Sequence, residues 1–134
     1  MSAGPVRELQ DMLAGLDPAC DPRPYRFLAL PLEDAGADWI EDPFAVIREE
    51  EGVTYIVPSD VEGGGKGHCA RITLRVHSAL DGVGLTAAVA TGLAAEGIAC
   101  NVVAAFHHDH LFVPWDRRED AMEVLRNLSD DARR

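Results

Sequence analysis

The chain has 134 residues, of which 47% are apolar, and it carries a formal net charge of −11 with an isoelectric point near 4.7. This length corresponds to one average domain or two small ones, and the apolar fraction is large enough to build a hydrophobic core, which excludes a disordered chain. The acidic excess would repel a phosphate backbone or an anionic membrane, so we expect neither nucleic acid nor a membrane as partner.

The three cysteines, Cys20, Cys69 and Cys100, are odd in number, widely spaced and free of any Cys-x-x-Cys pair. This usage is typical of reduced structural thiols in the cytosol. The N-terminus shows no basic segment followed by an apolar run, and the weakly polar stretch 79–95 falls short of a membrane span. The sequence therefore predicts a cytoplasmic protein.

In chain order, the first predicted element is a helix that Asp17-Pro18 ends, because the residue before a proline avoids helical geometry. Its apolar face is formed at helical spacing by Val6, Leu9, Leu13 and Leu16. A strand and a β-hairpin are then expected over 25–30, 44–48 and 53–57. The glycine-rich segment 63–67 lacks the spacing of a phosphate-binding loop and is predicted to be a linker.

The second half is more regular. Ile72, Leu74 and Val76 alternate with polar residues, which predicts a half-buried strand. Leu85, Val89 and Leu93 recur at helical spacing, and Gly97 is expected to end that helix. Two strands, over 98–106 and 110–113, and a helix capped by Asp116 complete the chain. The apolar side of this last helix is formed by Ala121, Val124, Leu125 and Leu128.

Between the strand and the helix of the second half lies the loop Asp81-Gly82-Val83-Gly84. Together with the order of the elements, this loop resembles that of the ACT domain, a ferredoxin-like βαββαβ module that binds amino acids and similar metabolites to regulate other proteins. The whole chain resembles small bacterial tandem ACT-like proteins of uncharacterised role. The residues that carry the resemblance are Val76-His77-Ser78-Ala79-Leu80, Val83-Gly84-Leu85-Thr86-Ala87, Asn101-Val102 and His108-Asp109-His110.

The resemblance implies an α+β protein with two ACT-type halves packed as one compact unit. Residues 1–66 would form an abbreviated N-terminal ACT-like half and 67–134 the C-terminal ACT domain. The sequence departs from the ACT pattern at Val83, where a proline is usual, and it has no clear fourth strand after the last helix. We therefore expect strands from elsewhere to complete the C-terminal half.

In ACT domains the effector usually sits where this loop meets the opening of the second strand of a neighbouring domain. The resemblance implies that the backbone N–H groups of Gly82, Val83, Gly84 and Leu85 hold a carboxylate, which a helix N-terminus favours. Asp81 would hold the α-ammonium group, and Cys100 and Asn101 would add contacts from the second strand. A structural interpretation is also open, in which Asp81 only caps the helix and the glycines only shape the turn.

The implied function is a small-molecule sensor, with an amino acid as the expected ligand and no catalytic activity or cofactor of its own. No hydrolase, zinc-protease or dinucleotide motif is present. Ligand binding would shift a homodimer or an unknown protein partner between states.

Two alternatives remain. The cluster His107-His108-Asp109-His110 carries three imidazoles and a carboxylate, which are ligands of zinc or nickel. Neighbours in a strand face apart, so only a pair such as His108 and His110 would converge, and His68 or His77 would have to complete the site. The second alternative is a purely structural dimerisation module.

Overall fold

The computed structural model describes residues 8–34, 40–59, 67–77, 79 and 81–134. Within them, the strands are β1 (Pro18–Leu30), β2 (Ala45–Arg48), β3 (Val53–Pro58), β4 (Cys69–Leu74), β5 (Asn101–Ala104) and β6 (Asp109–Pro114). The helices are α1 (Leu9–Ala14), α2 (Leu85–Ala95) and α3 (Arg118–Arg133), with short 3-10 turns η1 (Leu32–Asp34) and η2 (Trp115–Arg117). The fold is α+β, as predicted.

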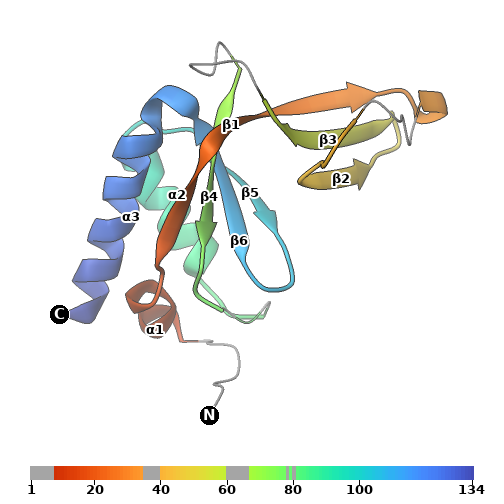
Figure 1. Cartoon of the computed structure of the whole chain (residues 1–134). Helices are drawn as coiled ribbons and strands as arrows, with labels where there is room; N and C mark the ends of the chain where they lie inside the picture. Colours follow the sequence, from red (N-terminus) through yellow and green to blue (C-terminus); the bar gives the residue numbers. More distant parts are fainter. Residues whose placement is uncertain (1–7, 35–39, 60–66, 78, 80) are drawn as a thin grey trace.

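All six strands form one antiparallel sheet in the order β2-β3-β1-β4-β6-β5, and the three helices lie on one side of its C-terminal part (Figure 1). In a ferredoxin-like unit the third strand lies between the first and the second. Both β4-β6-β5 and β1-β3-β2 have this arrangement, so the sheet consists of two such halves joined at their first strands. The first strand of each half occupies the place of the other's fourth strand. The prediction that the C-terminal half is completed from elsewhere is therefore confirmed.

β1 begins at Pro18, seven positions before the predicted strand at 25–30. Its first part pairs with β4, with Cys20 opposite Ile72, and its second part pairs with β3, with Phe27 opposite Ile56. Three prolines between 18 and 24 concealed the first part, because proline lacks the N–H of a strand ladder and is tolerated only at strand starts, edges and irregularities. The register shift between Cys20 and Pro24 is such an irregularity. The pairing of β1 with β4 joins the two predicted halves, 1–66 and 67–134. The boundary between these halves stays a prediction.

The main core lies between the helices and the C-terminal part of the sheet. The predicted alternation is confirmed, since Ile72 and Leu74 in β4 and Val76 shortly after it are all buried. The predicted spacing in α2 is also confirmed. The other buried side chains of this core come from both layers and include Leu85, Val89, Leu93, Leu111, Val113, Ala121 and Leu125. Gly97 ends the α2 region with φ 69°, in the left-handed range predicted for it.

Two details of the helices differ from the prediction. In α1 the buried residue is Met12, which the predicted face did not include, whereas Leu9 is 38% exposed; the predicted Leu16 is buried just beyond the end of the helix. At the other end of the chain Asp116 lies within the turn η2, and the residue that precedes α3 is Arg117, so the predicted cap by Asp116 is wrong. Helical spacing predicts that a helix is amphipathic, but which face is buried depends on the partner element.

The N-terminal part of the sheet keeps the same two faces without helices in the described residues. Leu28, Val53 and Tyr55 cluster on the face that carries the helices in the other half. On the opposite face Tyr25, Ile56 and Phe112 form a third cluster, which spans both halves. The aromatic rings of Tyr25 and Phe112 meet edge to face at 6.2 Å between centroids.

Candidate functional site

The loop that carries the resemblance enters α2 through Gly84. This glycine occupies the N-cap position with φ 104°, a backbone conformation that other residues rarely adopt. No side chain caps the helix there. The structural interpretation of Asp81 as the helix cap is therefore wrong, and glycine at this position is required by the backbone.

A cavity of about 110 Å³ lies beneath the loop. Its volume is that of roughly four water molecules, at ~30 Å³ each. Three separate segments form its walls, namely the loop, α1 and the turn between β5 and β6. The residues that line it are Met12, Ala79, Gly82, Leu85, Thr86, Ala104, Ala105, His107, His108 and Asp109.

α1 packs directly onto the glycines of the loop. A Cβ atom at Gly82 would lie 3.1 Å from the sulfur of Met12, and one at Gly84 would lie 3.2 Å from Cδ2 of Leu9. The carbonyl oxygen of Ala14 accepts hydrogen bonds from Ser129 Oγ at 3.1 Å and from Arg133 Nε at 3.0 Å, both on α3. The first helix is thus fixed to the C-terminal half and forms one wall of the cavity.

Two polar groups of the cavity wall come from the β5–β6 turn. His108 Nδ1 is buried and has no hydrogen-bond partner among the described residues. Burial raises the pKa of Asp109, an effect that the neighbouring His108 partly offsets. His108, whose Nδ1 is itself buried, therefore lines the cavity next to a carboxyl group that is easier to protonate than usual. Such a pair can exchange hydrogen bonds with a small polar molecule.

The sequence did not assign His108 and Asp109 to the ligand loop. An antiparallel hairpin after α2 brings its turn back to the end of the sheet where β4 finishes, because Leu74 lies opposite Asp109. The sequence does not show this pairing of β4 with β6, so it could not place the turn beside the loop. Only the order of strands in the sheet reveals that the loop and the histidine turn are neighbours.

The other predicted ligand residues lie outside the cavity. Val83 is 82% exposed and Asp81 is exposed as well. Cys100 packs against the main core, and Asn101 is the first residue of β5, opposite Phe112. The cavity is lined by Ala104, the last residue of that strand. Within one chain the structure therefore brings Gly82 and Leu85 together with the turn, but not with Asn101.

The histidine cluster separates into different environments. His110 lies 3.0 Å from Thr73 Oγ1 through Nδ1, away from the cavity that His108 lines. The ring of His107 lies 5.9 Å from that of His77. No group of three potential metal ligands occurs in the part of the chain that the structure describes. His110 and His108 thus have different neighbours, Thr73 for the former and the cavity for the latter, and their convergence on a metal stays a prediction.

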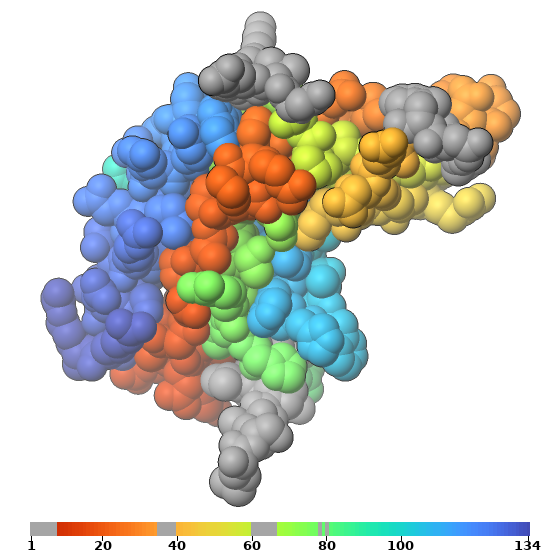
Figure 2. All heavy atoms as spheres, viewed as in Figure 1, coloured from red at the N-terminus to blue at the C-terminus, as the bar shows by residue number. Residues whose placement is uncertain are grey.

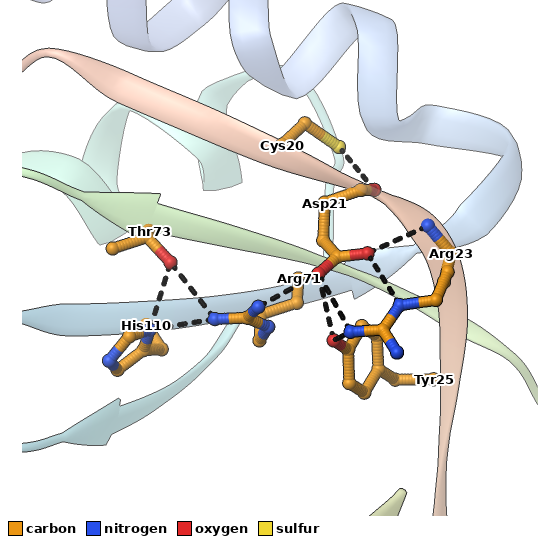
Figure 3. Close-up of polar contacts among 7 residues, drawn as sticks. All are labelled: Cys20, Asp21, Arg23, Tyr25, Arg71, Thr73 and His110. Atoms are coloured by element: carbon orange, nitrogen blue, oxygen red, sulfur yellow. Dashed lines mark hydrogen bonds and ion pairs between the residues drawn. The ribbon is translucent and has the colours of Figure 1, made fainter. Parts of the chain in front are cut away.

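A polar network crosses the helix-free face of the sheet at the junction of the two halves (Figure 3). Asp21 accepts a hydrogen bond from Arg71 Nη2 at 2.8 Å and one from the Tyr25 hydroxyl at 2.9 Å. Arg23 donates to the same carboxylate through its backbone N–H at 2.8 Å and its side chain. Burial opposes ionisation of Asp21, but the bonds from Arg23, Tyr25 and Arg71 outweigh it and hold its pKa far below the usual range.

His110 ends this network on β6. Burial, and then the charges of Arg71 and His108, lower its pKa to about 4. The guanidinium of Arg71 also lies 4.4 Å from the ring centre of Phe44, which leads into β2. The network therefore links β1, β4 and β6 with the N-terminal hairpin, and its one carboxylate, Asp21, is shared by Arg23 and Arg71.

Comparison with known proteins identifies the family. Residues 68–127 and residues 4–61 each match an ACT-domain family. The chain is 35% identical to a Vibrio cholerae protein of unknown function, described as a possible transport protein, with a TM-score of 0.75 over 90% of this chain and 95% of that one. The chain therefore belongs to the ACT-domain superfamily, whose members are regulatory modules.

More distant structures share the fold alone. The protein Atu0741 of Agrobacterium tumefaciens is 19% identical, with a TM-score of 0.61 over 80% of this chain and 84% of that one. The regulatory subunit of aspartate kinase from Thermus flavus is 12% identical, with a TM-score of 0.62 over 83% and 95% of the two chains. No curated protein matches the chain. In the described segments no helix is long and apolar enough to cross a membrane.

Proposed function

We propose that the protein is a regulatory sensor that binds a small amino acid in the cavity beneath the glycine loop. The observation that carries the proposal is a cavity of about 110 Å³ whose walls are the glycine loop, the start of α2 and the turn that carries His108 and Asp109. A ligand that fills this cavity would meet the helix N-terminus on one side and polar side chains on the other.

The two ends of an amino acid match the two sides of the cavity. The backbone N–H groups between Gly82 and Leu85 lie at the N-terminus of α2, where the helix dipole favours a carboxylate. On the other side Asp109, when ionised, accepts from an ammonium group. Asp81, at the start of the loop, is the second acidic partner that the family resemblance implies for the ammonium group. The small volume favours ligands such as glycine, alanine or serine.

A second copy of the chain is part of the proposal. Asn101 lies at the end of β5 away from the cavity of its own chain, so a role in binding requires the Asn101 of a neighbouring protomer. β5 is the last strand of the sheet, and Asn101 is exposed there. A homodimer would thus place the ligand between protomers, and binding would shift its arrangement or its contact with a partner protein. The three free cysteines agree with the reduced cytoplasm as its compartment.

The test is a thermal-shift screen of tag-free protein against all proteinogenic amino acids, with and without chelator. A ligand at a hundred times its Kd should stabilise the fold by about 2.7 kcal/mol, a rise of several degrees in Tm. Asp81→Ala should abolish this rise while costing at most about 1 kcal/mol of stability, because the residue caps no helix. A panel without any shift would contradict the sensor, and a Tm that falls only with chelator would favour a metal site instead.

The dimer is tested by mixing variants. Asp81→Ala and Asn101→Ala each damage one side of a shared site, so each alone should show no ligand shift. If the site lies between protomers, re-equilibrated mixtures contain hybrid dimers with one intact site and regain part of the shift. No regain would show that each chain binds by itself.

A further inference from the structure

The hairpin of the N-terminal half stands out from the rest of the molecule as an arm. It consists of β2, β3 and the turn 49–52 between them, and it projects beyond the region covered by helices (Figures 1 and 2). β2 is its outer strand and the last strand of the sheet on that side. The outer backbone N–H and C=O groups of β2 therefore pair with no other strand of the described chain. An open edge of this kind can accept an additional strand.

β2 is apolar on both of its faces. Val46 is 51% exposed and lies opposite Tyr55, whereas Ile47 is 40% exposed and lies opposite Thr54, so the two side chains point to different faces of the sheet. Phe27, 45% exposed, lies on the same face as Ile47. An exposed edge strand with large apolar residues is usually protected by lysine, proline or a bulge. Here only Arg48 provides a basic side chain on the strand.

Both ends of this strand are acidic. Glu49, Glu50 and Glu51 form the turn that follows it, and Glu41 and Asp42 precede it. All five side chains are exposed. Glu49 also accepts a hydrogen bond from Thr54 Oγ1, which orients its carboxylate along the hairpin. The charges thus flank the open edge and produce a negative potential along it.

This charge pattern decides which strand fits the edge. A second copy that added its own β2 in antiparallel orientation would bring the turn 49–51 of one chain next to Glu41 and Asp42 of the other. Like charges directly opposite each other in a sheet are destabilising. A strand with lysine or arginine at its ends would meet opposite charges instead, and its apolar side chains would cover Val46 and Ile47.

We propose that β2 is a docking site where a partner protein adds an extended basic segment to the sheet. The backbone ladder supplies affinity in this mode of recognition, and the alternating side chains supply specificity. The acidic composition of the chain then has a local role at the arm in addition to solubility.

The probe is a fluorescein-labelled peptide, Lys-Val-Arg-Val-Lys-Val, whose binding is followed by fluorescence anisotropy at low salt. The triple variant Glu49→Gln, Glu50→Gln and Glu51→Gln should weaken binding about tenfold, because three of the flanking charges are lost. The control variant Glu96→Gln, Glu119→Gln and Glu123→Gln changes the net charge equally at exposed positions of the helical layer. It should bind as the parent does.

A peptide with alternate backbone nitrogens methylated keeps the charges but cannot form a full strand ladder, so it should bind at least about tenfold more weakly. Absence of binding to the parent would overturn the proposal. Equal weakening in the two triple variants would show unspecific charge attraction, and equal binding of the methylated peptide would exclude strand addition. Circular dichroism of both variants verifies that the fold is retained.

Discussion

The two halves of the molecule share one strand order but differ in what covers it. The C-terminal half keeps both helices of the ferredoxin-like unit, and between the helices and the sheet lies the main core. In the described residues the N-terminal half keeps only strands and the turn η1, and its own helix, α1, packs on the other half. The C-terminal half thus forms the helix-covered body that contains most of the cavity wall. The other became an extension of its sheet and provides a wall of the cavity.

The largest expected effect separates the buried main core from the exposed edge of the arm. Leu111 is 1% exposed in the main core, and Leu111→Ala should lower the free energy of unfolding by about 2–5 kcal/mol through lost burial and a cavity. Val46 is 51% exposed on the arm, and Val46→Ala should change it by less than about 0.5 kcal/mol. Urea unfolding measures both. Similar losses in the two variants would contradict the burial of Leu111 in the main core.

The turn of the arm lies in close backbone contact with β1 at Gly52. A Cβ atom there would collide with the carbonyl oxygen of Leu30 on β1. Gly52→Ala should therefore cost about 1–3 kcal/mol, because backbone rather than a flexible side chain must move. Gly15→Ala is the matched control, since its nearest contact would be an ordinary 3.4 Å and its φ is −98°. An unchanged urea midpoint for Gly52→Ala would show that the hairpin is not held against β1.

The junction between the halves depends on the charge of Asp21. Its folded-state pKa is depressed, so it stabilises the fold above its unfolded pKa of about 4 and this contribution is lost as pH falls further. Asp21→Asn should lower the free energy of unfolding by about 1–3 kcal/mol at pH 7. The guanidinium of Arg71, whose buried Nε already has no partner, would then lose its ion pair as well. The difference from the parent should shrink below about pH 4. A difference that persists unchanged at pH 2 would assign the loss to packing.

A smaller pH effect is expected from His110. Because its pKa in the folded protein is about 4, the unfolded chain binds a proton first as pH falls below about 6.5, and stability declines between these two values. In His110→Gln the fall in the free energy of unfolding over this pH range should be smaller by about 1 kcal/mol, a value that allows for solvent screening of this partly exposed group. Urea midpoints at pH 7 and pH 5 measure it. An identical pH dependence in parent and variant would exclude His110 as the titrating group.

The fold could be predicted where local pattern and tertiary partner agree. The alternation at Ile72, Leu74 and Val76 places β4, and the hairpin of β2 and β3 lies where apolar runs flank an acidic turn with Gly52. The first part of β1 could not be predicted, because its prolines read as loop and its pairing with β4 is set by residues about fifty positions away.

The candidate site was predicted in part for the same reason. Gly82 and Leu85 follow from the loop pattern, and both line the cavity. His108 and Asp109 were predicted as part of the family resemblance and as possible metal ligands, but not as cavity residues, since nothing local shows that their turn returns to the loop. Met12 was missed because the apolar spacing indicated the face of Leu9 instead. Contacts between elements distant in sequence decide which residues share a site.

The most direct test is to map ligand binding by NMR, using the amino acid that gives the largest thermal shift. Backbone amide shifts of ¹⁵N-labelled protein are followed during the titration. The account predicts the largest changes at Gly82, Gly84, Leu85 and Asp109, around the cavity. Changes confined to other parts of the molecule, such as the open hollow beside Arg26 and Asp42, would contradict it.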